Sequence, residues 1–333
     1  MKVLVTGGTG YIGSHTVVEL LENNYEVVIF DNLSNSKEEV IDKIKEITGK
    51  RPIFVKGDLV NIDEIKAVFE EYEIDSVIHF AGLKAVGESV SIPIKYYENN
   101  IVGTLNLIKV MQDFNCKKIV FSSSATVYGD KNKAPYTEHM ELGATNPYGR
   151  TKLMLEEIFR DLYNSDNSWR ISLLRYFNPV GAHKTGLIGE NPNGIPNNLM
   201  PYILKVSVGE LPILNIFGGD YNTSDGTGVR DYIHVVDLAI GHIRALEYIK
   251  DNEGIEAVNL GSGKGTSVLE LVNSFEKVND LKLNYKITDR RQGDIDICYA
   301  NPDKAKRIFN WETKSNVDEM CKDSYNFIIK NKT

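Results

Sequence analysis

Short apolar runs alternate with amphipathic stretches through the first half of the chain. The apolar runs cover residues 2–6, 25–30, 52–55, 75–80, 118–121 and 171–175. Between them, apolar residues recur at helical spacing, as Val17, Val18, Leu20 and Leu21 do. Continuous apolar strands that alternate with helices are typical of a parallel sheet with helices on both faces. The pattern predicts an α/β fold with a doubly wound, Rossmann-like parallel sheet.

Two predicted helices carry more apolar surface than one face of a sheet requires. One covers residues 92–115, and the other begins at Pro147 and continues to Leu162. The surplus indicates either thick internal packing or the interface of a homodimer. Both interpretations stay open at this stage.

A glycine-rich turn lies between the first strand and the first helix. Gly7, Gly10 and Gly13 follow the strand directly, and a second strand ends at Asp31. Such a turn lets bare backbone approach a pyrophosphate, which the helix N-terminus then stabilises. A carboxylate at Asp31 can bind both ribose hydroxyls and would repel a 2′-phosphate. The stretch therefore predicts a site for NAD rather than NADP.

The regular alternation breaks after Phe177, where Gly, Pro and Asn become frequent. A helix over 235–248 and a strand over 257–260 are expected to return to the sheet. We therefore expect an NAD-binding Rossmann domain over residues 1–177, with return segments near 234–260. Residues 178–333 are expected to form mainly a smaller α/β domain that binds the substrate above the strand ends.

Composition excludes several classes of protein. The 333 residues are 42% hydrophobic and 25% charged, which is typical of a globular protein, and the net charge of −8 disfavours nucleic-acid binding. No apolar stretch is long enough to span a membrane. The 3 cysteines have no metal-ligand spacing and indicate reduced thiols in the cytoplasm. His234 and Asp237 lack a third ligand, so no metal site is expected.

A tyrosine and a lysine stand four residues apart near the start of the helix that begins at Pro147. Tyr148 and Lys152 would then share one helix face, where the ammonium is expected to lower the pKa of the phenol. Ser124 follows the strand over 118–121 and could hydrogen-bond an oxygen whose proton moves. These three side chains are the candidate catalytic groups.

These motifs resemble the extended short-chain dehydrogenase/reductase family. The longer stretches 80–89, 122–129, 175–183, 194–201 and 225–234 narrow the resemblance to the UDP-glucose 4-epimerases within that family. The resemblance covers residues 2 to about 311. It implies an isomerase that interconverts UDP-glucose and UDP-galactose through a transient 4-keto sugar, with NAD held throughout. It also implies galactose metabolism as the setting.

The resemblance assigns most of the site, residue by residue. NAD contacts fall on the glycine turn and on the triad Ser124, Tyr148 and Lys152, and also on Tyr11, Ile12, Asp31, Asn32, Asn35, Ser36, Asp58, Leu59, Phe80, Ala81, Lys84, Asn99 and Phe177. Sugar-nucleotide contacts fall on Ser124, Tyr148, Asn178, Asn198, Leu199, Asn215, Phe217, Arg230, Arg291 and Asp294. Arginines suit a pyrophosphate because guanidinium groups bind its oxygens in pairs.

Two other functions compete with this interpretation. A nucleotide-sugar 4,6-dehydratase needs an acid and a base beside Ser124, where this chain has Ala125 and Thr126. A non-catalytic dinucleotide sensor would not need Tyr148 and Lys152.

One position bears on substrate breadth. The family alignment places Cys298 where narrower epimerases carry a bulky tyrosine. The smaller thiol predicts additional activity on UDP-N-acetylglucosamine and UDP-N-acetylgalactosamine. A shift of register by one residue would place Tyr299 there instead.

Overall fold

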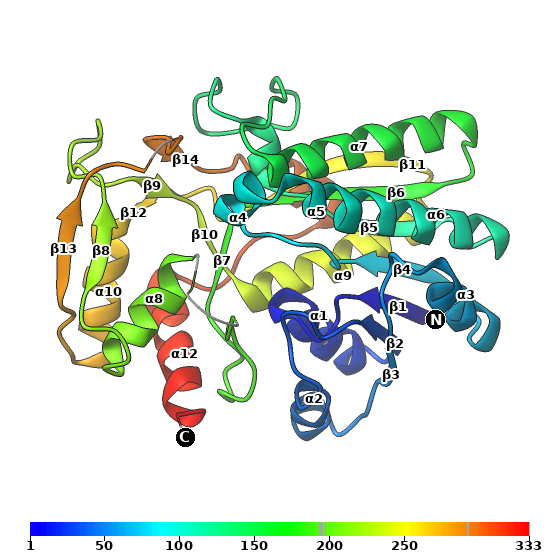
Figure 1. Ribbon diagram of the computed structural model, residues 1–333, viewed down its shortest axis with the longest axis horizontal. Coiled ribbons are helices and arrows are strands. Elements are labelled where there is room, and N and C mark those ends of the chain that lie inside the picture. The colour runs from blue at the N-terminus through cyan, green and yellow to red at the C-terminus, as the bar shows by residue number, and fades with distance from the viewer. Residues whose placement is uncertain (193–195, 197, 292, 333) are drawn as a thin grey trace.

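The computed structural model describes residues 1–192, 196, 198–291 and 293–332, and its main element is a seven-stranded sheet (Figure 1). The strands are β1 (Lys2–Thr6), β2 (Glu26–Asp31), β3 (Ile53–Lys56), β4 (Ser76–His79), β5 (Lys118–Ser122), β6 (Arg170–Tyr176) and β11 (Gly254–Leu260). All are parallel, in the order β11-β6-β5-β4-β1-β2-β3. The predicted doubly wound sheet is confirmed. Strand order reverses between β1 and β4, where a crevice forms in such sheets.

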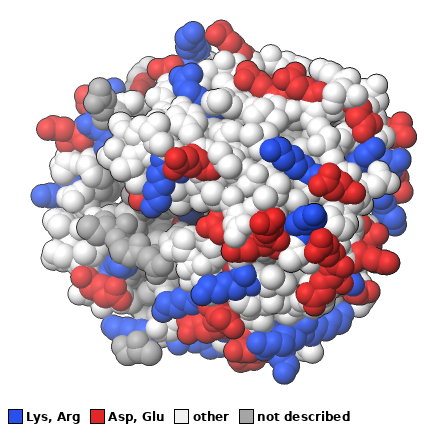
Figure 2. Space-filling model, turned by 45° about the vertical axis from the view of Figure 1, so that its right-hand side comes forward, with Lys and Arg blue, Asp and Glu red and all other residues white. Residues whose placement is uncertain are grey.

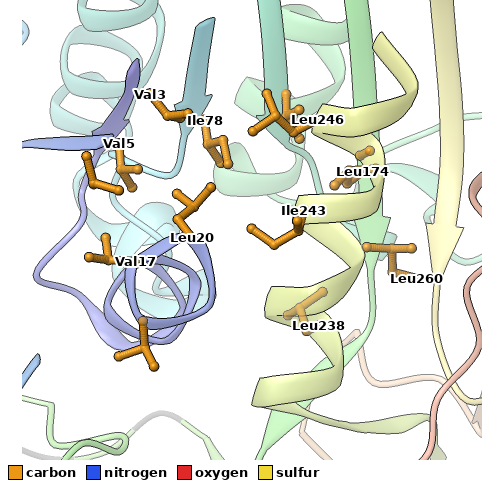
Figure 3. Packing of buried hydrophobic residues seen from close by; sticks show 14 of the residues in the cluster. Val3, Val5, Val17, Leu20, Ile78, Leu174, Leu238, Ile243, Leu246 and Leu260 are labelled. Carbon is orange, nitrogen blue, oxygen red and sulfur yellow. The ribbon is translucent and has the colours of Figure 1, made fainter. Parts of the chain in front are cut away.

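Helices cover both faces of this sheet. One face carries α1 (Tyr11–Glu22), α2 (Val40–Thr48), α9 (Val235–Asp251) and α11 (Asp303–Phe309), and the other carries α3 (Ile62–Glu71), α6 (Gly103–Asp113) and α7 (Pro147–Ser165). Side chains alternate along each strand, so Val3 and Val5 of β1 join the first core and Leu4 joins the second. In the first core, Leu20 of α1 and Ile243 of α9 lie against the strands (Figure 3).

After β6 the chain returns twice to the lobe that contains the seven-stranded sheet, called the sheet lobe. Helix α9 and strand β11 form the predicted return. A second return was not predicted: α11 and Trp311 pack against α9 and β11 in the same core. The domain boundary at residue 177 stays a prediction.

A smaller lobe lies beside the sheet, on the left of Figure 1. Its elements are β7 (Asn178–Val180), α8 (Leu199–Ser207), β8 (Leu214–Phe217), β9 (Val229–Arg230), β10 (Tyr232–His234), β12 (Thr266–Ser267), α10 (Val268–Asn279), β13 (Tyr285–Thr288), β14 (Ile297–Cys298) and α12 (Val317–Lys330). Ile203, Leu271 and Phe275 belong to its separate core. Capping boxes begin α10 and α12, where Ser267 and Asn316 pair with the glutamates three residues on.

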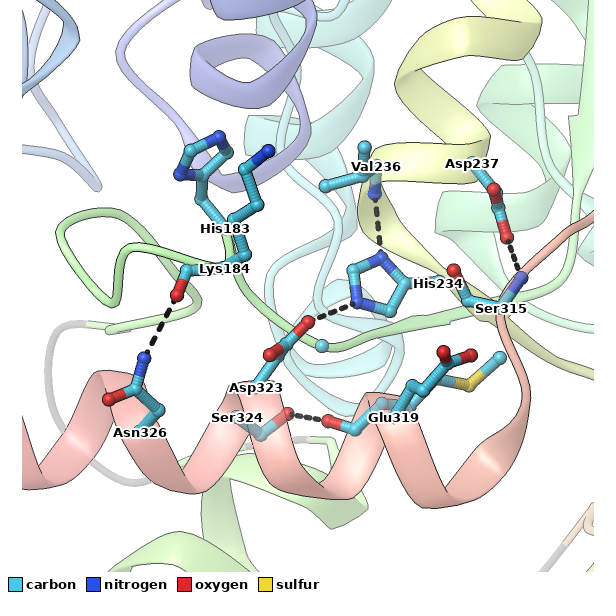
Figure 4. Close-up of polar contacts among 12 residues, drawn as sticks. His183, Lys184, His234, Val236, Asp237, Ser315, Glu319, Asp323, Ser324 and Asn326 are labelled. Atoms are coloured by element: carbon cyan, nitrogen blue, oxygen red, sulfur yellow. Dashed lines mark hydrogen bonds and ion pairs between the residues drawn. The ribbon is translucent and has the colours of Figure 1, made fainter. Parts of the chain in front are cut away.

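Polar contacts join α12 to the start of α9 (Figure 4). His234 precedes α9 and accepts the Val236 N–H on Nδ1 at 3.1 Å, while its Nε2 lies 3.2 Å from Asp323. Asp237 accepts the Ser315 N–H at 2.9 Å. His234 and Asp237 therefore have structural partners, and they fasten the two lobes together.

The predicted helix over 92–115 is interrupted. It consists of α5 (Pro93–Tyr97), a π-helical turn (Glu98–Val102) and α6, and a short helix α4 (Val86–Ser91) precedes it. An extra residue per turn shifts the helix face, and such turns often lie at functional sites. Of the motifs quoted above, Gly194, Ile195 and Asn197 lie outside the described residues.

The surface carries charges of both signs. On the face drawn in Figure 2, acidic and basic side chains are interspersed. Within the described part of the chain, none of the helices combines the length and the apolar content that crossing a bilayer requires.

Candidate active site

One cavity of about 1510 Å³ opens at the carboxyl ends of the strands, between the two lobes. Every residue that the sequence assigned to catalysis, cofactor binding or sugar-nucleotide binding lines this cavity. The glycine turn and Asp31 come from the sheet lobe, and Arg230, Arg291 and Cys298 come from the smaller lobe. The structure therefore brings together residues from nearly the whole chain.

The glycine turn has the geometry that a dinucleotide site requires. Gly7 has a φ of +70°, and a Cβ there would lie 2.8 Å from the Ala81 nitrogen. A Cβ on Gly13 would lie 2.2 Å from the Gly7 oxygen, so only glycine allows α1 this close to β1. Gly10 is the N-cap of α1 and provides no side-chain cap. The first N–H groups of α1 thus line the cavity and can bind a phosphate.

Asp31 ends β2 at the adjoining wall. Its carboxylate accepts N–H groups of Thr9 at 3.1 Å and Leu33 at 2.9 Å, which fix its orientation. Nearby, the Asn32 amide donates to Asp58 at 2.9 Å. A fixed carboxylate beside a glycine turn matches the diol of an adenosine ribose. The residues present therefore fit NAD.

Ser124 follows β5 and caps a short 3₁₀ turn. Its Oγ accepts the Thr126 N–H at 3.2 Å and the Thr126 hydroxyl at 3.0 Å, which leaves its own proton for another acceptor. Tyr148 lies in the first turn of α7, where Asn146 caps the helix by accepting the Gly149 N–H at 2.9 Å. Cap and turn together direct the phenol and the serine into the same part of the cavity.

Tyr148 and Lys152 do not shift each other's pKa as the sequence predicted. Burial raises the pKa of Tyr148, and the neighbouring Ser124 hydroxyl opposes only part of this shift. Burial lowers the pKa of Lys152 to about 7. Its Nζ donates to the Ser122 carbonyl at 2.6 Å and lies 4.8 Å from the centre of the Phe121 ring. Loss of hydration is the main cause of both pKa shifts. The i, i+4 spacing alone did not reveal this effect.

Asn100, in the π-helical turn, supports the site through contacts that the sequence did not reveal. It is buried, accepts the Leu83 N–H at 2.8 Å and donates to the Leu83 carbonyl at 3.0 Å. It also donates to Thr151 Oγ1 at 3.0 Å, and that hydroxyl donates to the Tyr148 carbonyl at 2.7 Å. Asn100 thus joins the loop after β4 to the helix that carries Tyr148. The neighbouring Asn99 lines the cavity.

Two arginines face each other across a shared carboxylate in the smaller lobe. Asp294 lies 3.6 Å from Arg230 and accepts a hydrogen bond from Arg291 Nε at 3.2 Å. The Arg291 guanidinium stacks 4.9 Å from the centre of the Phe217 ring, whose side chain is exposed at the end of β8. Two neighbouring guanidinium groups have the charge and the hydrogen-bond donors that a diphosphate requires.

Amide side chains line the wall near these arginines. Asn215 lies on β8, and its buried Oδ1 has no hydrogen-bond partner among the described residues. Because Asn215 lines the cavity, this acceptor is available to a ligand. Asn178 lies on β7, while Asn198 is the N-cap of α8 and Leu199 is the first residue of that helix.

The register at the end of β14 places a thiol at the cavity. Cys298 pairs with Arg230 and lines the cavity beside the buried Tyr136 ring. The Tyr299 ring lies on the other side, where it would contact a Cβ on Gly265. Adjacent strand residues thus point in opposite directions, as the sequence predicted.

Residues 125 and 126 provide no acid–base pair. Ala125 and Thr126 belong to the 3₁₀ turn that Ser124 caps, and the Thr126 hydroxyl is bonded to Ser124. The dehydration chemistry considered above therefore lacks carboxylates at these positions.

Known proteins match this chain over nearly its full length. A family model described as GDP-mannose 4,6 dehydratase matches residues 4–324. The UDP-glucose 4-epimerase of Bacillus subtilis is 60% identical over 331 residues, which are 99% of this chain and 98% of that protein.

Solved structures agree with the sequence relatives. UDP-glucose 4-epimerase from Bifidobacterium longum, crystallised with NAD⁺ and UDP, has a TM-score of 0.96 and 52% identity, covering 99% of each chain. The UDP-Glc/GlcNAc 4-epimerase of Campylobacter jejuni has a TM-score of 0.86 and 35% identity, again covering 99% of each chain. By fold, by site and by full-length similarity, this chain belongs to the family of the GDP-mannose 4,6 dehydratase model and to the UDP-glucose 4-epimerase family.

Proposed function

We propose that this chain is a UDP-glucose 4-epimerase, an isomerase that interconverts UDP-glucose and UDP-galactose through a transient 4-keto sugar. One observation supports this above all. Ser124 and Tyr148 line the same cavity as the α1 N-terminus and Asp31 of the sheet lobe and Arg230 and Arg291 of the smaller lobe. A dinucleotide and a sugar diphosphate then meet at a proton-transferring tyrosine.

Each part of the site has a separate task. The glycine turn, Asp31 and the loop after β4 would hold NAD, which would supply hydride transfer at the sugar C4. Tyr148 takes the proton of the 4-hydroxyl on its phenolic oxygen, and Ser124 donates a hydrogen bond to the same sugar oxygen. Arg230 and Arg291 hold the diphosphate as a pivot while the sugar ring turns over.

The enzyme assay uses UDP-glucose and UDP-galactose without added NAD. Interconversion supports the epimerase, whereas a 4-keto-6-deoxy sugar would indicate the dehydratase and an unchanged substrate would indicate a binding protein. Tyr148→Phe is the matched variant because its ring still fills the same space. We expect its rate to fall by about 10²- to 10⁴-fold, as for a lost general acid–base group. A rate above half that of the unsubstituted enzyme contradicts the role of Tyr148.

A broader substrate range is part of the proposal. The Cys298 thiol leaves room beside the sugar C2, so UDP-N-acetylglucosamine and UDP-N-acetylgalactosamine are expected as a second pair of substrates. Cys298→Tyr should suppress turnover of the acetylated pair and spare UDP-galactose. If the unsubstituted enzyme never converts UDP-N-acetylglucosamine, the thiol does not open the pocket.

A homodimer in the cytoplasm completes the proposal. Val86, Val90, Ile94 and Met154 are exposed on α4, α5 and α7, which pack together. Neighbouring apolar side chains on packed helices suit an interface with a second copy of the chain. The three cysteines, Cys116, Cys298 and Cys321, are free thiols, which suits a reducing compartment.

A further inference from the structure

Glu190 lies between the two binding regions and has no role in the function proposed above. It belongs to the segment between β7 and α8, and its side chain is only 9% exposed. Its Oε1 accepts a hydrogen bond from Lys84 Nζ at 3.1 Å and another from Asn198 Nδ2 at 2.8 Å. One oxygen of a mostly buried carboxylate thus holds two donors from different parts of the chain.

The two donors come from different lobes. Lys84 follows β4, on the side proposed for the dinucleotide, and its Nζ lies 6.0 Å from the centre of the Tyr11 ring at the start of α1. Asn198 caps α8, on the side proposed for the sugar nucleotide. All four side chains line the same cavity. Glu190 is therefore a direct link between the cofactor side and the substrate side.

The negative charge of Glu190 makes UDP binding depend on the cation beside it. A carboxylate in a cavity that receives diphosphates repels them unless a cation neutralises it. Lys84 is the cation that lies within ion-pair distance of Glu190 among the described residues. If Lys84 were removed, the full negative charge of Glu190 would face the bound UDP through Asn198. Lys84 would then affect UDP binding without touching UDP.

We propose that Glu190 is a positioning residue that couples Lys84 on the cofactor side to Asn198 and the sugar nucleotide. The proposal rests on the function proposed above. Coupling between two sites is reciprocal. If the contact between Lys84 and Glu190 depends on how Asn198 is placed, then removing Lys84 changes the affinity for UDP by the same factor. A merely structural Glu190, which only fastens its own segment, would produce no such dependence on Lys84.

The test is a double-mutant cycle on the NAD-loaded protein, with the dissociation constant of UDP measured by calorimetry in excess NAD. Lys84→Met should weaken UDP binding about 5- to 10-fold when Glu190 is present, a typical coupling strength. In a protein that already carries Glu190→Gln or Glu190→Ala, Lys84→Met should change the dissociation constant of UDP less than about 2-fold, because the carboxylate charge is gone. Glu190→Gln keeps an acceptor for Asn198 and hence the local fold.

Equal effects of Lys84→Met with and without the carboxylate would overturn the coupling, because Lys84 would then act on UDP independently. If the unsubstituted protein binds no UDP, the proposed function fails, and the coupling fails with it. The control cycle uses Arg244→Met and Glu247→Gln. These substitutions remove an exposed ion pair on α9, in which Arg244 Nη1 lies 2.7 Å from Glu247 Oε2. This control cycle should leave UDP affinity unchanged.

Discussion

Burial, rather than the neighbouring charge, sets the protonation of the two central side chains. Lys152 has a carbonyl and an aromatic ring as its close partners, and its pKa falls to about 7. An ammonium held without a carboxylate destabilises a fold. The identity and spacing of Tyr148 and Lys152 could be read from the sequence, but their hydration depends on the strands and helices packed around them.

Lys152→Met should therefore stabilise the protein while removing most activity. The unfolded amine stays protonated up to about pH 10.4, whereas the folded amine loses its proton near pH 7. The cost of the buried ammonium is therefore complete below pH 7 and disappears as the pH rises towards 10.4. Denaturant unfolding without dinucleotide should show a gain of about 2 kcal/mol at pH 6.5 that shrinks by pH 9.5. A loss of stability at pH 6.5 would contradict this account.

Elements with strong local patterns were predictable, and short ones were not. Most strands of the large sheet are apolar runs with buried side chains, so their positions could be read within one or two residues, except that β11 begins at Gly254 rather than at Ala257. Strands such as β9 and β14 have two residues each and are defined by pairing with distant segments. The π-helical turn also escaped prediction, because a shift of helix face at Asn100 follows from its contacts with Leu83 and Thr151.

Asn100→Leu tests the role of that turn. The substitution keeps the volume but leaves Leu83 and Thr151 without their buried partner, at a cost of about 1–3 kcal/mol for each unpaired group. We expect lower unfolding free energy and a reduced kcat, because α7 no longer holds Tyr148 against the loop after β4. Asn252→Leu, at an exposed amide that donates to the Tyr248 carbonyl, should change stability by less than about 0.5 kcal/mol. Equal effects of the two substitutions would show that the turn has no special role.

At the scale of the whole molecule, the site is assembled from segments far apart in the chain. The sequence resemblance named the lining residues, but Glu190, Tyr136 and the second return of the chain at α11 emerged only from the packing. The exposed apolar side chains on α4, α5 and α7 likewise became a coherent patch only once these helices were placed together.

Ile94→Glu should convert the proposed dimer into monomers. Ile94 is 66% exposed in the single chain, and burying such a side chain against a partner contributes about 1.5–3 kcal/mol, which a charge would reverse. Sedimentation equilibrium should give twice the chain mass for the unsubstituted protein and the mass of one chain for the variant. Ile329→Glu, at an exposed position on α12, should remain dimeric. A dimer that survives Ile94→Glu would place the interface elsewhere.

The most direct measurement of the central claim follows the hydrogen on the sugar C4. UDP-glucose that carries deuterium at C4 is converted in ordinary water, and the product is analysed by NMR. Because a hydride that leaves C4 and returns to it does not exchange with water, UDP-galactose should keep the deuterium at C4. Product with hydrogen from water at C4, or no UDP-galactose at all, would contradict the account.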